Sequence, residues 1–338
     1  MEERKFVTAE ELEAARLEVI RLGGPHLKKA KTYWWIALSG FLGTCVILLI
    51  NAMVSGGETN VAVFVLAGIL TVVFIVFIML HGKEQKIYMN YLNPFNATYK
   101  TQFLPAILEE SFEKIYAFEP HNGLSKEIVI KSGIFPSFDY ITTNDYLRAS
   151  HNGMNFEYCD TELQERHEES DSDGGTRTVI DTMFLGVFII AEFDHFVDTP
   201  LYILDGGGKG TVTTESEIFN QNFSVKCENE IDALRILTPE MMDHILKIKE
   251  FCKKSIDLAF FDDKIYFCSS LGGDRLEIAG SIDIPVYESR KQVDEDIVFI
   301  KQLLDLLNIR NLKSKSSQRK LTDEDYKGNS VYQNEHRG

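Results

Sequence analysis

The sequence predicts an α+β protein in which an N-terminal two-helix transmembrane hairpin precedes a mixed α+β cytosolic domain. Two observations predict this class. Two long runs without Asp, Glu, Lys or Arg lie early in the 338-residue chain, and the β-type segments after them cluster instead of alternating regularly with helices. The composition, with 44% hydrophobic and 25% charged residues, is that of a folded globular chain.

The charge of the chain narrows the class of its partners. Lys and Arg number 35 against 51 Asp and Glu, which gives a formal net charge of -16. A protein that grips nucleic-acid phosphates over its whole surface has the opposite balance. We therefore expect no nucleic-acid partner.

Residues 1–31 are predicted to form an N-terminal cytosolic amphipathic helix. Thr8 followed by Glu11 is a capping box, which marks a helix start. Gly23-Gly24-Pro25 predicts the end of this helix before the membrane. The apolar face repeats at helical spacing and consists of Leu12, Ala15, Val19 and Leu22.

Residues 32–81 are predicted to form the transmembrane hairpin, with spans 33–54 and 61–80. Each span meets the roughly 20 apolar residues that a helix needs to cross a bilayer. Residues 55–60 form so short a linker that the spans must be antiparallel neighbours. A cleaved signal peptide is the competing interpretation of the first span, but a long charged stretch precedes it and no clear cleavage site follows.

The flanking charges predict the orientation of the hairpin. Lysines lie on the outer flanks of the two spans, whereas the linker carries no Lys or Arg. The positive-inside rule then puts both termini in the cytoplasm and the linker outside. The flanking residues are Lys28, Lys29, Lys31, Lys83 and Lys86.

Small residues in the first span predict close helix packing. Gly40 and Gly43 let a neighbouring helix approach. A pore of several hairpins with Asn51 as an interhelical contact is a weaker alternative, because a conducting path favours charge within the membrane.

Residues 82–309 are predicted to form the cytosolic α+β domain, and residues 310–338 a disordered tail. The expected helices are 87–118, broken near Pro94 and Pro105, then 142–149, 238–251 and 294–308. The expected strands are 126–131, 153–158, 178–193, 201–204 and 223–227, with a hairpin over 256–268 that turns at Asp262-Asp263 and an exposed acidic loop over 162–175.

Neither a metal nor a cofactor is predicted. Asp171-Ser172-Asp173-Gly174 resembles the start of a calcium loop but lacks the later ligands. His151, Cys159 and His167 do not have the spacing of a compact zinc site, and the 5 cysteines contain no CxxC pair. The glycine-rich turn around Lys209 lacks the spacing of a phosphate-binding P-loop.

One polar group is a candidate catalytic or ligand-binding site. Glu192, Asp194 and His195 lie at the exit of the most apolar strand, and Lys209 could contact an anion. A carboxylate, an imidazole and an amine that converge would permit acid–base chemistry. Sequence proximity does not establish convergence, and no hydrolase, metalloprotease or dinucleotide motif accompanies these residues.

Several segments resemble a bacterial family catalogued as domain of unknown function 3137. They are MFLGVFIIAEF at 183–193, FNQNFSV at 219–225, DALRILTP at 232–239 and the hairpin-like stretch 256–268. The resemblance covers about residues 95–308. It implies a membrane hairpin, a cytosolic α+β domain and a bacterial plasma membrane, and it brings no catalytic residues because the family has no assigned activity.

These observations favour a membrane-anchored cytosolic interaction or scaffold module over an enzyme. Without a recognisable catalytic constellation, the patterned domain is expected to bind a protein partner or to self-associate. The face formed by Leu12, Val19 and Leu22 and the tail are the expected contact elements. The alternative is a ligand-binding domain or enzyme with a pocket near Glu192.

Overall fold

The computed structural model describes residues 6–54, 61–170, 176–208, 210–272, 275–277 and 282–308. It divides into two units, Met1–Phe112 with Asp274–Val298, and Glu113–Gly273 with Phe299–Gly338. We describe each unit by itself. The predicted linker 55–60, the calcium-like start at Asp171, Lys209 and the tail 310–338 lie outside the described residues, and the domain boundaries stay predictions.

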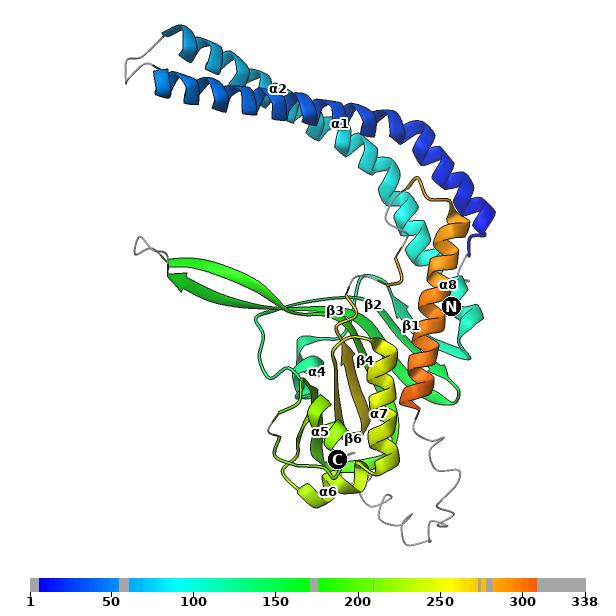
Figure 1. The fold of residues 1–338 in the computed structure, drawn as a ribbon. Coiled ribbons are helices and arrows are strands. Elements are labelled where there is room, and N and C mark those ends of the chain that lie inside the picture. Colours follow the sequence, from blue (N-terminus) through cyan, green and yellow to red (C-terminus); the bar gives the residue numbers. More distant parts are fainter. Residues whose placement is uncertain are drawn as a thin grey trace, which may run out of the picture. The chain divides into compact units, whose positions relative to one another are not determined.

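The first unit is helical, and its two long helices confirm the predicted apolar pair. Both are long and apolar enough to cross a membrane by length and composition. Figure 1 shows them side by side and antiparallel. The helices of this unit are α1 (Ala9–Val54), α2 (Val61–Thr98), the π-helical turn η1 (Tyr99–Phe103), α3 (Leu104–Ser111) and the first part of α8 (Val286–Leu307).

The predicted helix end at Gly23-Gly24-Pro25 is wrong, because α1 continues through Pro25. Proline removes one backbone donor, but α2 packs beside α1 at this point. A Cβ on Gly23 would lie only 3.1 Å from the Tyr88 ring of α2. The predicted break at Pro94 is also wrong, since α2 runs to Thr98. Tertiary packing therefore overrides both local helix-breaking signals.

One seam joins α1 to α2 along most of their lengths. Its positions on α1 alternate at spacings of three and four residues, which is the heptad spacing of a coiled coil. Many of them are small or polar, so hydrophobic periodicity does not reveal them. They are Leu12, Arg16, Val19, Gly23, His26, Ala30, Tyr33, Ala37, Gly40 and Thr44, and all are buried or half-buried.

The second unit is built on a six-stranded sheet whose described pairings are all antiparallel. The order is β1-β2-β3-β4-β5, and β6 also pairs with β4. β4 is the spine, because β3, β5 and β6 all pair with it. The strands are β1 (Lys114–Glu119), β2 (Tyr140–His151), β3 (Met154–Ser170), β4 (Thr176–Asp205), β5 (Phe223–Lys226) and β6 (Ile256–Ser269).

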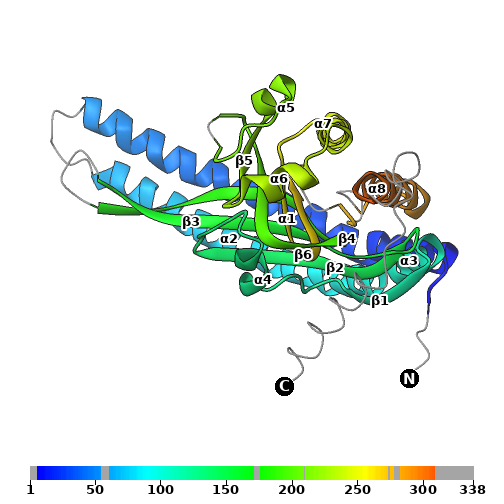
Figure 2. The same ribbon diagram turned by 90° about the horizontal axis from the view of Figure 1, so that it is seen from below.

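Helices lie on both faces of this sheet. Figure 2 shows α4 on one face and α7 on the other. The predicted cap at Thr238 is confirmed, because its side chain accepts from the Met241 backbone N–H at 3.3 Å. The helices are α4 (Lys126–Lys131), α5 (Glu217–Asn222), α6 (Glu230–Ile236), α7 (Pro239–Cys252) and the end of α8.

Two short segments were assigned the wrong element from the sequence. The predicted strand 126–131 is helix α4, whose Val129 is fully buried in the core beside Leu124 and Ile134. The predicted helix 142–149 lies in β2, which pairs with β3 almost throughout. A pattern of apolar and polar residues this short fits either a helix or a strand. Long-range packing and strand pairing then decide which of the two forms.

Two further predictions are wrong in β3 and β6. The expected acidic loop from residue 162 continues as β3 to Ser170, paired with β4. The expected hairpin over 256–268 is one strand, and both of its halves pair with β4. At Asp262 the backbone adopts a positive φ of 55°, and the register of β6 against β4 shifts there. The Asp-Asp pair therefore does not turn the chain. It lies opposite a bulged stretch of β4, which has more residues than β6 between the paired positions on either side of Val197.

Candidate functional site

The apolar surface of α1 and α2 is the clearest functional feature of the first unit. Large side chains in the expected spans are exposed, including Leu49 at 63%, Met53 at 85% and Met79 at 69%. Core helices of a soluble protein bury such side chains. An apolar surface of this extent indicates contact with a membrane or another apolar partner.

Polar side chains within the expected spans bond to their own helix. The hydroxyl of Ser39 donates to the Trp35 carbonyl at 2.8 Å, and that of Thr44 to the Gly40 carbonyl at 3.0 Å. In α2 the Thr71 hydroxyl donates to the Ala67 carbonyl at 2.9 Å. Hydroxyls that are satisfied in this way can enter hydrocarbon without losing hydrogen bonds.

The predicted close packing at Gly40 is confirmed. A Cβ on Gly40 would lie 3.4 Å from the Leu70 carbonyl oxygen of α2. Aromatic pairs continue the contact on either side, with ring centroids 5.5 Å apart for Phe41 and Phe74 and 5.6 Å apart for Tyr33 and Phe77. The hairpin therefore packs through small residues and interleaved rings, as membrane helices do.

Polar contacts replace apolar ones just outside the expected spans. His26 Nδ1 lies 2.5 Å from Glu84 Oε2, and His81 Nδ1 lies 2.9 Å from the Ala30 carbonyl oxygen. The Trp34 ring packs 5.5 Å from the His81 ring. Together with the flanking lysines, this belt has the composition expected at a membrane–water interface.

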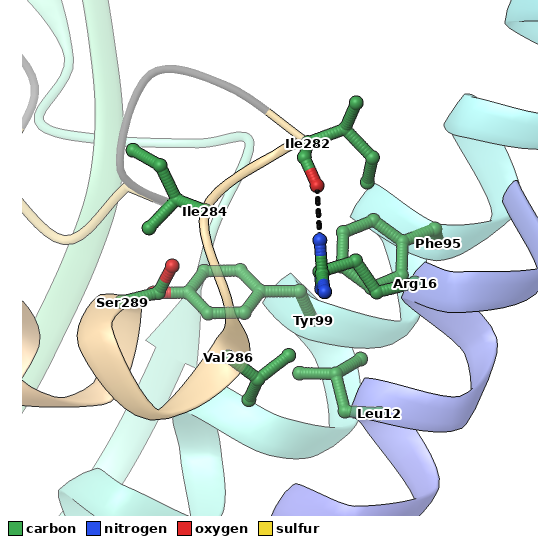
Figure 3. A pocket seen from close by; sticks show the side chains of 8 residues that line it. All are labelled: Leu12, Arg16, Phe95, Tyr99, Ile282, Ile284, Val286 and Ser289. Atoms are coloured by element: carbon green, nitrogen blue, oxygen red, sulfur yellow. Dashed lines mark hydrogen bonds between the residues drawn. The ribbon is translucent and has the colours of Figure 1, made fainter. Parts of the chain in front are cut away.

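A pocket lies in the first unit where α1 and η1 meet the residues before α8 (Figure 3). It has room for about one water molecule and is too small for a drug-sized ligand. Most of its lining is apolar. The lining residues are Leu12, Arg16, Phe95, Tyr99, Ile282, Ile284, Val286 and Ser289.

Arg16 is the only charged residue in this lining, and each of its three nitrogens already donates a hydrogen bond. Its Nε and Nη2 donate to the Glu13 carboxylate at 2.9 and 2.7 Å. Its Nη1 donates to the Ile282 carbonyl at 2.7 Å, the hydrogen bond drawn in Figure 3. The hydrogen bond from Arg16 holds the pKa of the Glu13 carboxyl below its ordinary value. The Glu13 carboxylate balances the charge of Arg16, so this arrangement braces the fold and leaves no unbalanced positive charge to attract an anion.

The predicted site residues make contacts with different neighbours. The Glu192 carboxylate accepts from Asn155 Nδ2 of β3 at 2.7 Å. The His195 ring packs against the Phe193 ring at 5.4 Å, in the stretch where the register of β4 against β6 shifts. None of Glu192, Asp194 and His195 lines the pocket of Figure 3. A ligand site at these residues stays a prediction.

A polar cluster that the sequence did not predict joins β4, α7 and β6. Asp205 pairs with Lys249 through its side chain, and its backbone N–H donates to Asp257 Oδ1 at 2.8 Å. The other Asp205 carboxylate oxygen accepts from the Ile256 N–H at 3.3 Å. The Cys268 thiol lies 3.9 Å from Asp257 Oδ2. No local motif could reveal this cluster, because its members lie far apart in the chain.

The pKa values of the two carboxyl groups of the cluster are shifted in opposite directions. Burial raises the pKa of Asp205, but hydrogen bonds from Lys249 and Ser255 outweigh it and leave this pKa below its ordinary value. Burial raises the pKa of Asp257, and it also raises the pKa of the Cys268 thiol well above its ordinary value. A protonated thiol is a poor nucleophile, and the contacts of the cluster brace the strand ends.

No metal site emerges from the part of the chain that the structure describes. No group of three or more His, Cys, Asp or Glu side chains there could hold an ion. In particular, the imidazole of His151 binds Asp305 Oδ1 at 2.9 Å, and Cys159 is buried beside Thr161.

One family model matches part of the chain. Residues 182–309 match the model of a family described as "Protein of unknown function (DUF3137)". This segment begins in β4 and ends just after α8, and the resemblance expected from the sequence is confirmed there. No curated protein matches the chain.

One solved structure shows a weak likeness to the chain. It is the "crystal structure of the mycobacterial trehalose monomycolate transport factor A, TtfA", at 8% identity and a TM-score of 0.29. The alignment covers 56% of this chain and 88% of that one. A TM-score this low does not establish a shared fold.

Proposed function

We propose that this protein is a membrane-anchored interaction module. The hairpin of α1 and α2 would span a bacterial plasma membrane through residues 33–54 and 61–80, with both termini in the cytoplasm. The domain that carries the family match would then lie in the cytosol and bind a protein partner or a second copy. The apolar, exposed surface of the helix pair is the observation that carries this proposal.

The polar contacts of the hairpin support this anchor and its expected orientation. Hydroxyls within the spans are bonded to their own helices, whereas the charged contact between His26 and Glu84 lies outside the spans. The lysines that flank both spans favour the cytoplasmic side for this end. A soluble protein does not need to keep its polar contacts between helices outside two long apolar segments.

The structure also removes one expected contact surface. Leu12 and Val19, on the expected docking face, are only 1% and 5% exposed, because they pack within the first unit. A partner must therefore use another surface. The absence of a recognisable catalytic arrangement in the described residues supports binding over catalysis.

The proposal is tested with the full-length protein in its own membranes. Membranes washed with alkaline carbonate should retain it, and gentle detergent extraction followed by native mass spectrometry should show a second copy or a stoichiometric protein partner. Release by carbonate would overturn the anchor. A monomer that carries no protein in repeated preparations would overturn the interaction role.

A further inference from the structure

Part of the sheet in the second unit extends as a two-stranded arm. Beyond Gln164, β3 no longer pairs with β2, and before Val187, β4 does not pair with β6. Residues 165–170 and 176–181 therefore pair only with each other among the described strands. Figure 1 shows this arm projecting from the rest of the sheet. A two-stranded ribbon is marginally stable alone.

The outer edge of β4 in this arm is open and has the composition of a strand that pairs. No described strand pairs with it from Thr176 to Phe184. Such an edge is a template for another strand, and β-branched residues favour extended pairing. Those in the arm are Thr176, Thr178, Val179, Ile180 and Thr182.

The charges of this edge are complementary to themselves. We propose that β4 of the arm pairs antiparallel with the same strand of a second copy, about a two-fold axis at Val179. Arg177 would then lie opposite Asp181 of the second copy, and Asp181 opposite its Arg177. Thr178 would face Ile180, and Thr176 would face Thr182, which are favourable cross-strand pairs.

Neighbouring registers lose this complementarity. A two-fold axis at Thr178 would put Arg177 opposite Val179, and one at Ile180 would put Arg177 opposite Met183. Both would leave the charges without an opposite partner across the edge. The Val179 register is therefore specified by sequence, and because the edge pairs with itself, it gives a closed dimer.

The charged side chains are accessible for this exchange. Arg177 is 72% exposed and contacts Glu169 at 2.8 Å, and Asp181 is 65% exposed and lies 3.6 Å from His167. Exposed ion pairs such as these contribute little to stability, so both side chains can exchange partners. Within the arm, Asp181 also stands directly opposite Glu165, a like-charge pair that an arginine from a second copy would relieve.

This inference rests on the proposed function, because it names a second copy as the partner. Anchoring in one membrane would also bring copies together and raise their effective concentration. The test uses two differently tagged full-length copies, expressed together and extracted in mild detergent. The fraction of one tag that purifies with the other is measured.

Charge exchange separates this edge from any other contact. Arg177→Asp in both copies, or Asp181→Arg in both, should reduce co-purification about tenfold, since two attractive pairs become repulsive. One copy with Arg177→Asp and the other with Asp181→Arg should pair again to near the wild-type level. This rescue between chains cannot come from a repair within either arm. The matched controls Arg166→Asp and Glu168→Arg, on β3 of the same arm, should leave co-purification unchanged.

Three results would overturn the inference. If wild-type copies associate and the single charge variants associate equally well, the contact lies elsewhere, and the proposed function survives without this edge. If the copies do not co-purify but a different protein does, the edge pairing fails while the interaction role stands. The inference would also be overturned if both single variants lose co-purification and the mixed copies fail to restore it.

Discussion

Glu13 and Arg16, one turn apart on α1, together hold the start of α8. Glu13 Oε2 accepts from the Val286 backbone N–H at 2.9 Å, and Arg16 Nη1 donates to the Ile282 carbonyl at 2.7 Å. The two side chains also pair with each other. A carboxylate at a helix N-terminus is stabilising, so this pair fixes residues far along the chain against the N-terminal part of α1.

Replacement of Arg16 should loosen this contact. Arg16→Met leaves the Glu13 charge without its partner and the Ile282 carbonyl without its donor, which costs about 1–3 kcal/mol. Hydrogen exchange of full-length protein in detergent should become faster over residues 282–290. The control is Arg21→Met, whose exposed pair with Glu18 spans 4.0 Å and should contribute under about 0.5 kcal/mol. Equal exchange in both variants would contradict the assigned role.

A bulky side chain at Gly40 should separate α1 from α2. Gly40→Leu forces atoms into the Leu70 backbone, 3.4 Å from the position of a Cβ, and overpacking of this kind costs about 1–3 kcal/mol. Thermal unfolding in detergent should shift downward by several degrees. Gly68→Leu on α2 is the control, since nothing lies within 4 Å of a Cβ there. If Gly68→Leu lowers the unfolding temperature as much as Gly40→Leu does, this packing is refuted.

Asp205 and Asp257 should give opposite dependences of stability on pH. The pKa of Asp205 is lowered in the folded state, so its stabilisation is present above its ordinary value of 3.8 and is lost as the pH falls through the folded pKa. The pKa of Asp257 is raised, so stability is lost as the pH rises from 3.8 through that folded pKa.

Amide variants separate these two contributions. Asp205→Asn should lower stability at pH 7 and reduce the loss in acid, whereas Asp257→Asn should raise or preserve stability at pH 7. The measurement is thermal unfolding of the full-length protein between about pH 2.5 and 8. Variants that shift the curve in the same direction at pH 7 would contradict the two assignments.

The cysteines of the second unit should be unreactive in the folded protein. Cys159, Cys227, Cys252 and Cys268 are buried, and burial raises the pKa of Cys159 to about 11. Brief treatment with N-ethylmaleimide at pH 7 should therefore leave these thiols unmodified by intact mass, while denatured protein should take up 5 labels. Rapid modification of the native protein at any of these cysteines would show that the second unit opens.

The helical hairpin could be predicted from the sequence, whereas the continuity of its helices could not. Long runs without charged residues indicate helices that could cross a membrane, because a charged side chain is costly in the bilayer. The seam through Gly23 and His26 depends on Tyr88 and Glu84 of the other helix, and no local pattern records that. The same reason explains why α1 passes Pro25.

The sheet shows the same limit. The alternation at 223–227 predicted β5 correctly, because the half-buried strand records its environment in each residue. In contrast, Lys126–Lys131 forms a helix and Asp262 lies within a continuous strand, because long-range packing and pairing decide between local alternatives. The cluster of Asp205, Lys249 and Asp257 could not be found from sequence, since its residues meet only in the folded chain.

The most direct test of the membrane anchor is labelling of single added cysteines in intact cells. Ser55→Cys, in the linker between the spans, should react with a membrane-impermeant maleimide from outside. Glu240→Cys, in the second unit, should react only after the membrane is permeabilised, and wild-type protein provides the background. Labelling of Glu240→Cys in intact cells, with Ser55→Cys protected, would contradict the proposed anchor and its orientation.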